Sequence, residues 1–143
     1  SGSEERYAGL SSAEVADLRA GRGMGLALPA ELNGYPGPVH VLELTDALRL
    51  SPAQRETMLR LVAAMRAEVI PLGEQLIAGE RVLDEVFVSG SASFASLNAA
   101  VAAAADARGA LRAAHLRVHL EARDALTDVQ RTAYARLRGY TPG

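Results

Sequence analysis

Three histidines are the residues of this chain best suited to chemistry. His115 and His119 are four residues apart, so on a helix their imidazoles would share one face about 6 Å apart. Two imidazoles at that spacing can bind one metal ion. His40 is followed by Glu43, which would lie one turn away on the same helical face. If these two approach the pair, the four residues form a nitrogen-rich site for Zn, Cu(II), Ni or Co.

Two alternatives to a metal site stay open for these histidines. Two histidines spaced i, i+4 also occur on helix surfaces and at protein interfaces without any metal. In addition, His115 falls in the apolar seam of its expected helix, which is compatible with a core or interface histidine.

No motif in the chain selects an enzyme. The glycine-rich stretch 21–25 precedes no strand–helix unit, so it does not match a dinucleotide-binding fingerprint. The absence of cysteine excludes thiol catalysis, disulfides and cysteine-ligated zinc. We therefore expect a non-enzymatic protein.

The composition indicates a helical protein that does not bind nucleic acid. Hydrophobic residues make up 49% of the 143 residues but aromatic residues only 4%, so the core must be built from Leu, Val and Ala. Such a core favours packed helices over a β-sandwich. The net charge is −2 with interleaved signs, which argues against a nucleic-acid surface. No apolar run reaches the roughly 20 residues that span a bilayer.

Capping signals divide the chain into helices that would position the histidines. Ser11 with Glu14 predicts a short helix ending near Gly21, and residues 21–37 predict an ordered loop with one helical turn. Pro38 predicts the first residue of a helix over about 38–49.

Two long helices and one short helix follow. A second capping box at residues 51–54 predicts a helix to about Val88, kinked at Pro71. Residues 89–93 predict a turn, and the next helix runs to about Ala125. A third capping box at 127–130 predicts a last helix ending near Gly139.

The apolar pattern of the two long helices predicts that they pack as an antiparallel hairpin. Apolar residues recur every three or four positions, at Met58, Val62, Met65, Val69, Leu72, Leu76, Leu83 and Val86 and then at Leu97, Val101, Ala104, Leu111 and Val118. Leu116 and Leu120 lie on the opposite side of the second helix. Because one hairpin covers only one face, a second protomer is the simplest cover for the other face.

Two of the capping boxes carry a family resemblance. Leu50-Ser51-Pro52-Ala53-Gln54 and Leu126-Thr127-Asp128-Val129-Gln130 are similar to the paired Leu-Thr-x-x-Gln motifs of the periplasmic Spy/CpxP family. The resemblance covers residues 38–140 and extends to the heavy-metal branch of that family, which includes CnrX-like and ZraP-like proteins. It implies an all-α fold, a long antiparallel helical hairpin with short N- and C-terminal helices, in an intertwined dimer.

The resemblance also implies where a metal would bind. The metal-sensor branch uses early-helix histidines, a carboxylate on the first long helix and a His-x-x-x-Met pair on the second. His40 matches the early histidine, and His115 and His119 match the pair with His in place of Met. Glu56 or Glu68 could supply the long-helix carboxylate. A second early histidine is missing, which leaves the coordination number and the metal open.

The expected domain organisation is simple. Ser1-Gly2-Ser3 has the look of a cloning scar, residues 4–37 form a short helix and ordered loop, 38–140 the hairpin domain and 141–143 a tail. We expect a periplasmic location, with a signal peptide or membrane anchor before the given residues. The expected function is a heavy-metal sensor or resistance accessory that works with a membrane-bound signalling partner. The alternative is an ATP-independent chaperone that binds unfolded clients on an apolar, Arg-lined surface.

Overall fold

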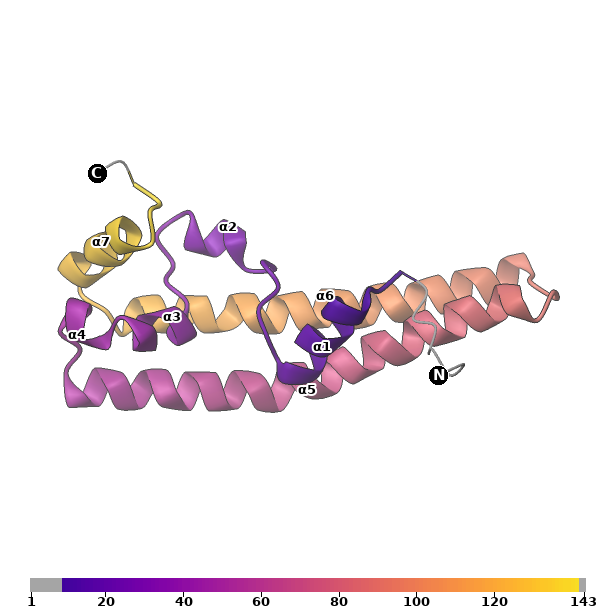
Figure 1. The fold of residues 1–143 in the computed structure, drawn as a ribbon, viewed down its shortest axis with the longest axis horizontal. Helices are drawn as coiled ribbons and strands as arrows, with labels where there is room; N and C mark the ends of the chain where they lie inside the picture. Colours follow the sequence, from indigo (N-terminus) through magenta and orange to yellow (C-terminus); the bar gives the residue numbers. More distant parts are fainter. Residues whose placement is uncertain (1–8, 142–143) are drawn as a thin grey trace. The chain divides into compact units, whose positions relative to one another are not determined.

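A computed structural model of the protein describes residues 9–141, and helices without any strand make up this part of the chain (Figure 1). The chain divides into two compact units, one from the described parts of 1–24 and 68–111, the other from 25–67 and the described part of 112–143. The helices are α1 (Ser12–Ala20), α2 (Leu28–Glu31), α3 (Pro38–Glu43), α4 (Thr45–Leu48), α5 (Pro52–Val88), α6 (Phe94–Asp124) and α7 (Asp128–Leu137). The all-helical prediction is confirmed. None of the described helices is both long and apolar enough to cross a membrane.

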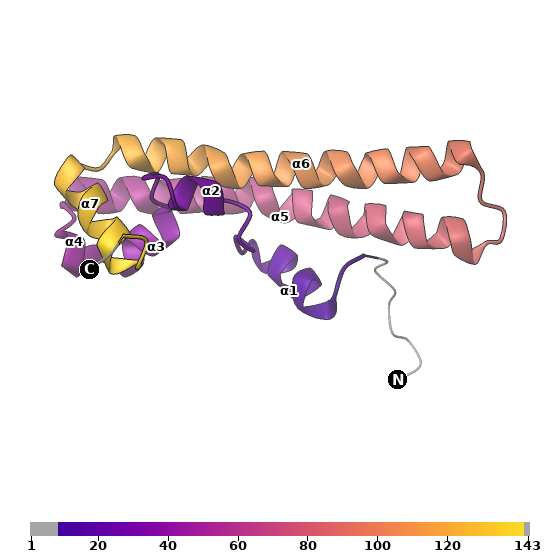
Figure 2. The same ribbon diagram turned by 90° about the horizontal axis from the view of Figure 1, so that it is seen from above.

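The long helix pair of the prediction is present as α5 and α6. Within each unit the two helices lie side by side in both views (Figures 1 and 2). α5 continues through Pro71 without interruption, and Ser93 begins α6 by accepting a hydrogen bond from the Ser96 backbone N–H at 3.1 Å. The predicted seam is buried at Met58, Val62, Met65, Val69 and Leu76 on α5.

In the first unit, small residues bring the helices close together. A Cβ added to Gly79 of α5 would lie 3.2 Å from the Cα of Ala104 on α6, so neither position leaves room for a larger side chain. The prediction that Val101 lies in this seam is wrong, because Val101 is 47% exposed and Ala100 is buried instead. In a stretch made almost entirely of alanine, the pattern of apolar residues does not distinguish one helical face from another.

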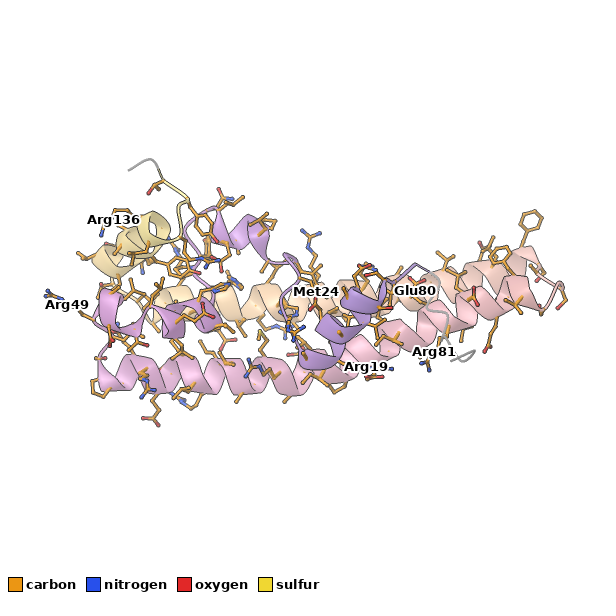
Figure 3. The ribbon with its side chains drawn as sticks, in the orientation of Figure 1. Arg19, Met24, Arg49, Glu80, Arg81 and Arg136 are labelled. Atoms are coloured by element: carbon orange, nitrogen blue, oxygen red, sulfur yellow. The ribbon has the colours of Figure 1, made fainter. Side chains whose placement is uncertain are left out.

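Helix α1 packs on α5 in the same unit. The predicted capping box of Ser11 and Glu14 is present at its start. A Cβ at Gly73 of α5 would lie 3.0 Å from the Leu18 carbonyl oxygen, so glycine permits this close approach. Arg19, labelled in Figure 3, bonds Glu74 of α5 at 3.2 Å.

In the second unit, the predicted helix over 38–49 is interrupted. Leu44 has φ −102° and ψ 21°, so α3 ends before it and α4 begins after it. The Thr45 hydroxyl donates to the Leu42 carbonyl at 2.5 Å, a side-chain bond that competes with the helical backbone ladder. Arg49 ends α4 with φ 52°, and its side chain is exposed (Figure 3).

The two Leu-Ser/Thr-x-x-Gln boxes meet in the second unit. The Gln54 side-chain amide donates to Gln130 Oε1 at 2.7 Å, and the Gln130 amide donates to Gln54 Oε1 at 2.9 Å. Each amide also donates to a backbone carbonyl, Gln54 to Ala125 and Gln130 to Leu48. Two motifs 76 residues apart are therefore cross-linked, beside a core of Val41, Leu48, Met58, Ala122, Leu126 and Tyr134.

The second face of α6 has a partial cover from its own chain. One shallow apolar groove is lined by Leu116 and Leu120 of α6 and by Pro29, Ala30, Asn33 and Tyr35. The Arg123 guanidinium lies 4.5 Å from the centre of the Tyr35 ring. Leu120 stays largely exposed. A second protomer is thus not the sole source of cover for this face, and the dimer remains a prediction.

Candidate functional site

The structure places the predicted site residues in two different environments. His115 and His119 are buried on α6, as the apolar seam indicated. His40 on α3 is 39% exposed, and its Nδ1 lies 3.0 Å from Glu43 Oε2, which is also at the surface. The pair of histidines and the His40–Glu43 pair are therefore both present, one inside the unit and one at its edge.

A residue that the sequence did not single out lies against the buried pair. Glu31, at the end of α2, is only 9% exposed, and its Oε1 is 3.3 Å from His119 Nε2. Its other oxygen, Oε2, accepts a hydrogen bond from the Tyr134 hydroxyl of α7 at 2.6 Å. The Gly37 backbone N–H donates to the same hydroxyl at 3.3 Å. One carboxylate of α2 thus contacts side chains of α6 and α7 in the second unit.

The hydrogen-bond partner of Nδ1 determines the tautomer of a neutral His119 ring. Nδ1 lies 2.8 Å from the carbonyl oxygen of His115, which can only accept, so Nδ1 carries a hydrogen. In a neutral ring Nε2 is then an acceptor. It faces Glu31 Oε1, which is also an acceptor when the carboxylate is ionised. The contact is favourable only with a positive charge between the two atoms: a proton or a metal ion.

Electrostatics favour the ionised form of Glu31. Burial raises the pKa of this carboxyl, but hydrogen bonds from His119 and Tyr134 and the charges of His119 and His40 outweigh burial, so the pKa is lowered. Burial, followed by the Glu31 contact, raises the pKa of Tyr134, so its hydroxyl stays a donor. A carboxylate that accepts from tyrosine on one oxygen is left with its other oxygen directed at His119.

His115 differs from His119 in its partners. Burial, and then the charge of His119, lower the pKa of His115, so its imidazole is neutral at pH 7. Within residues 9–141 no hydrogen bond reaches its ring. His115 is thus a buried, neutral nitrogen donor one helical turn from His119.

Gly37 forms the wall of this site. A Cβ added there would lie 2.7 Å from Glu31 Oε1 and 2.7 Å from His119 Nε2. Its φ of −88° suits any residue, so close approach, not backbone conformation, requires glycine. The space beside Gly37 is equally close to an oxygen ligand and a nitrogen ligand.

The arrangement is a pair of potential ligands, not a complete metal site. Among the described residues, no group of three or more His, Asp or Glu side chains is close enough together to hold a metal ion. The predicted set of His40, Glu43, His115 and His119 therefore stays a prediction. Within this set, His40 is linked to the buried site by charge, because it is near enough to Glu31 to stabilise the carboxylate.

Comparison with known proteins adds no relative: the chain matches no family model, no curated protein and no solved structure.

Proposed function

We propose that the chain is a periplasmic, non-enzymatic metal-binding protein, a heavy-metal sensor or resistance accessory for a divalent transition metal. The observation that carries this proposal is the buried contact between Glu31 Oε1 and His119 Nε2. Both atoms are acceptors when Glu31 is ionised and His119 is neutral. A transition-metal ion stabilises that arrangement and uses the two ligand types that such ions prefer.

The distance between the two atoms also fits a shared ion. Two ligands each about 2.0–2.1 Å from a tetrahedral ion such as zinc are about 3.3 Å apart. The same bond lengths around an octahedral ion would place them only about 2.9 Å apart. The separation in the structure is 3.3 Å. A proton-sharing His–Glu ion pair has the same separation, so Zn, Cu(II), Ni and Co are tested side by side.

Further ligands are near this pair. His115 is a buried, neutral imidazole on the preceding turn of α6 and is one candidate for a third ligand. His40, whose charge acts on Glu31, is the other. Either residue would complete three ligands and leave a fourth position for water.

Metal binding would work as a sensor by linkage. An ion shared by Glu31 and His119 ties the segment 25–37 to α6 and stabilises the docked state of that segment. The Gln54–Gln130 cross-link supports a Spy/CpxP-like hairpin, since it gives both glutamines of the paired motifs one structural role. A homodimer and a membrane-bound signalling partner belong to the same proposal.

The test is calorimetric titration of metal-free protein with Zn, Cu(II), Ni and Co. We expect Glu31→Gln to weaken binding at least about tenfold. Glu121→Gln is the matched control, an exposed carboxylate of α6 outside the predicted ligand set, and should have little effect. His119→Ala should abolish binding. Wild-type binding no tighter than about 100 µM, or full retention in Glu31→Gln and His119→Ala, contradicts the proposal.

A second function, an ATP-independent chaperone, is favoured by one feature of the first unit. Phe87 and Phe94, on either side of the 89–93 turn, are 61% and 87% exposed and line one apolar hollow with Leu97, and Val88 next to Phe87 is exposed as well. Exposed apolar clusters mark binding surfaces. A light-scattering assay with an aggregating client tests this function, with Phe87→Ser/Phe94→Ser as the matched variant. Absence of suppression at stoichiometric protein, with or without metal, refutes it.

A further inference from the structure

Tyr134 is the anchor of α7. Of the ten residues of this helix it is the one that is buried, at 1% exposure, and its ring belongs to the core of the second unit. Its hydroxyl donates a hydrogen bond to Glu31 Oε2. The most deeply buried side chain of α7 thus contacts the carboxylate that we propose to hold the metal.

Helix α7 depends on such docking. An isolated helix shorter than about 12 residues is marginal in water, so α7 is stable only through its contacts with the rest of the unit. Among the described residues, two other side chains of α7 form polar links to the rest of the unit. Gln130 bonds Gln54 and the Leu48 carbonyl, and Arg131 donates to the carbonyls of Arg123 and Leu126. A change in the Glu31 position therefore acts on the buried one of these side-chain attachments, the Tyr134 hydrogen bond.

The two oxygens of Glu31 contact different helices. Oε1 faces His119 on α6 and Oε2 accepts from Tyr134 on α7. A carboxylate is rigid and planar, so an ion that holds Oε1 restricts the positions that Oε2 can take. Conversely, the hydrogen bond from Tyr134 holds Oε1 towards His119.

We propose that Tyr134 couples metal binding at Glu31 and His119 to the docking of α7, which makes α7 the output element of the sensor. This inference rests on the proposed metal-binding function. Tyr134 is a positioning residue and does not touch the ion. By linkage, α7 docking must strengthen metal binding by the same factor by which metal strengthens docking.

The experiment compares Tyr134→Phe with Tyr140→Phe. Tyr140 is the matched control, because it follows α7 and its ring centre is 6.4 Å from that of Tyr134. Its hydroxyl accepts a hydrogen bond from Arg138 Nε at 3.4 Å, whereas the Tyr134 hydroxyl donates to Glu31. Zn(II) affinity is measured by calorimetry, and amide hydrogen exchange of residues 131–137 is followed by mass spectrometry with and without Zn(II). Loss of an outer hydrogen bond to a ligand weakens metal binding by about 10–100-fold.

We expect Zn(II) to slow exchange of residues 131–137 at least about fivefold in the wild type and in Tyr140→Phe. In Tyr134→Phe, affinity should fall about tenfold. Zn(II) should then still slow exchange of residues 28–37 but no longer that of 131–137. Unchanged affinity together with unchanged protection of α7 in Tyr134→Phe would overturn the coupling.

The outcomes separate the two proposals. If the wild type binds no Zn(II), Cu(II), Ni(II) or Co(II), the proposed function fails. If the wild type binds through Glu31 and His119 but α7 exchange is insensitive to the metal, only the coupling fails. Should Tyr134→Phe lose its helical circular dichroism, wild-type exchange decides: metal must slow 131–137, and lack of that effect refutes the coupling.

Discussion

Replacement of Gly37 by alanine gives the sharpest test of the contact between Glu31 and His119, because it adds one methyl group next to both atoms. The new Cβ would lie 2.7 Å from both Glu31 Oε1 and His119 Nε2, about 0.7 Å inside ordinary contact. The backbone at this position accepts alanine without strain. Any destabilisation of the folded state therefore comes from the two polar atoms that the methyl group forces apart.

The magnitude follows from the contact that is lost. A buried hydrogen bond to a charged group contributes about 1.5–3 kcal/mol. Alanine offsets about 0.4–1 kcal/mol of this, since it restricts the unfolded chain more than glycine does. The expected loss in the free energy of unfolding is about 1–2 kcal/mol. In a chain of this size that lowers Tm by roughly 2–8 °C. Metal binding should also be lost, because the methyl group fills the space between the two ligands.

Urea and thermal unfolding of purified variants measure this effect. Gly109→Ala is the matched control: no atom lies within 4 Å of its added Cβ, and Gly109 is inside α6. Alanine there should stabilise by about 0.5–1 kcal/mol. The two substitutions make the same chemical change with opposite expected signs. If Gly37→Ala is as stable as the wild type and binds metal equally well, Glu31 and His119 are not held together as described.

The other predictions concern the second unit. A double-mutant cycle of Gln54→Ala and Gln130→Ala, followed by urea unfolding, should give a coupling energy of about 1 kcal/mol; strictly additive losses would contradict the cross-link. Because the pKa of His115 is lowered from 6.5 in the fold, the unfolded chain binds more protons below that pH, so stability should decrease as pH falls through 6.5. His115→Gln should flatten this part of the pH profile, and an unchanged slope would assign it to another group. Below 4.5, protonation of the unfolded carboxyl should add a second decrease that Glu31→Gln removes. Arg49→Gly should raise stability by about 0.5–1 kcal/mol in thermal unfolding, since Arg49 has φ 52° and an exposed side chain; a destabilised variant would mean that the arginine makes a compensating contact.

The elements that the sequence predicted best are those with local signals. Each capping box places a hydroxyl and a carboxylate or amide three residues apart, and that spacing alone satisfies two backbone N–H groups at a helix start. The boxes beginning at Ser11, Ser51 and Thr127 accordingly begin α1, α5 and α7. The 89–93 turn was equally local. Such signals need no knowledge of the rest of the chain.

Errors arose where two local preferences compete. Around Leu44, the apolar pattern continues a helix, but the Thr45 hydroxyl offers the Leu42 carbonyl another partner and the backbone turns. Around Val101, alanine on every side makes several helical faces nearly equivalent. Close approach of Gly79 to Ala104 decides between them, and a close approach is a property of two helices together.

The candidate site shows what spacing on one helix can and cannot reveal. His115 and His119 were identified because four residues along one helix determine their distance. Glu31 lies 88 residues from His119 in the chain, and in the sequence it is one acidic residue in a loop expected to be ordered. One feature did point to it: Glu31 is the only ionisable group besides Tyr35 between residues 23 and 39, and a charge within such an apolar segment must find a buried partner or stay exposed. In the folded protein the carboxylate is buried against His119. Because an ionised carboxylate and a neutral imidazole nitrogen are both acceptors, their contact requires a proton or a metal ion between them.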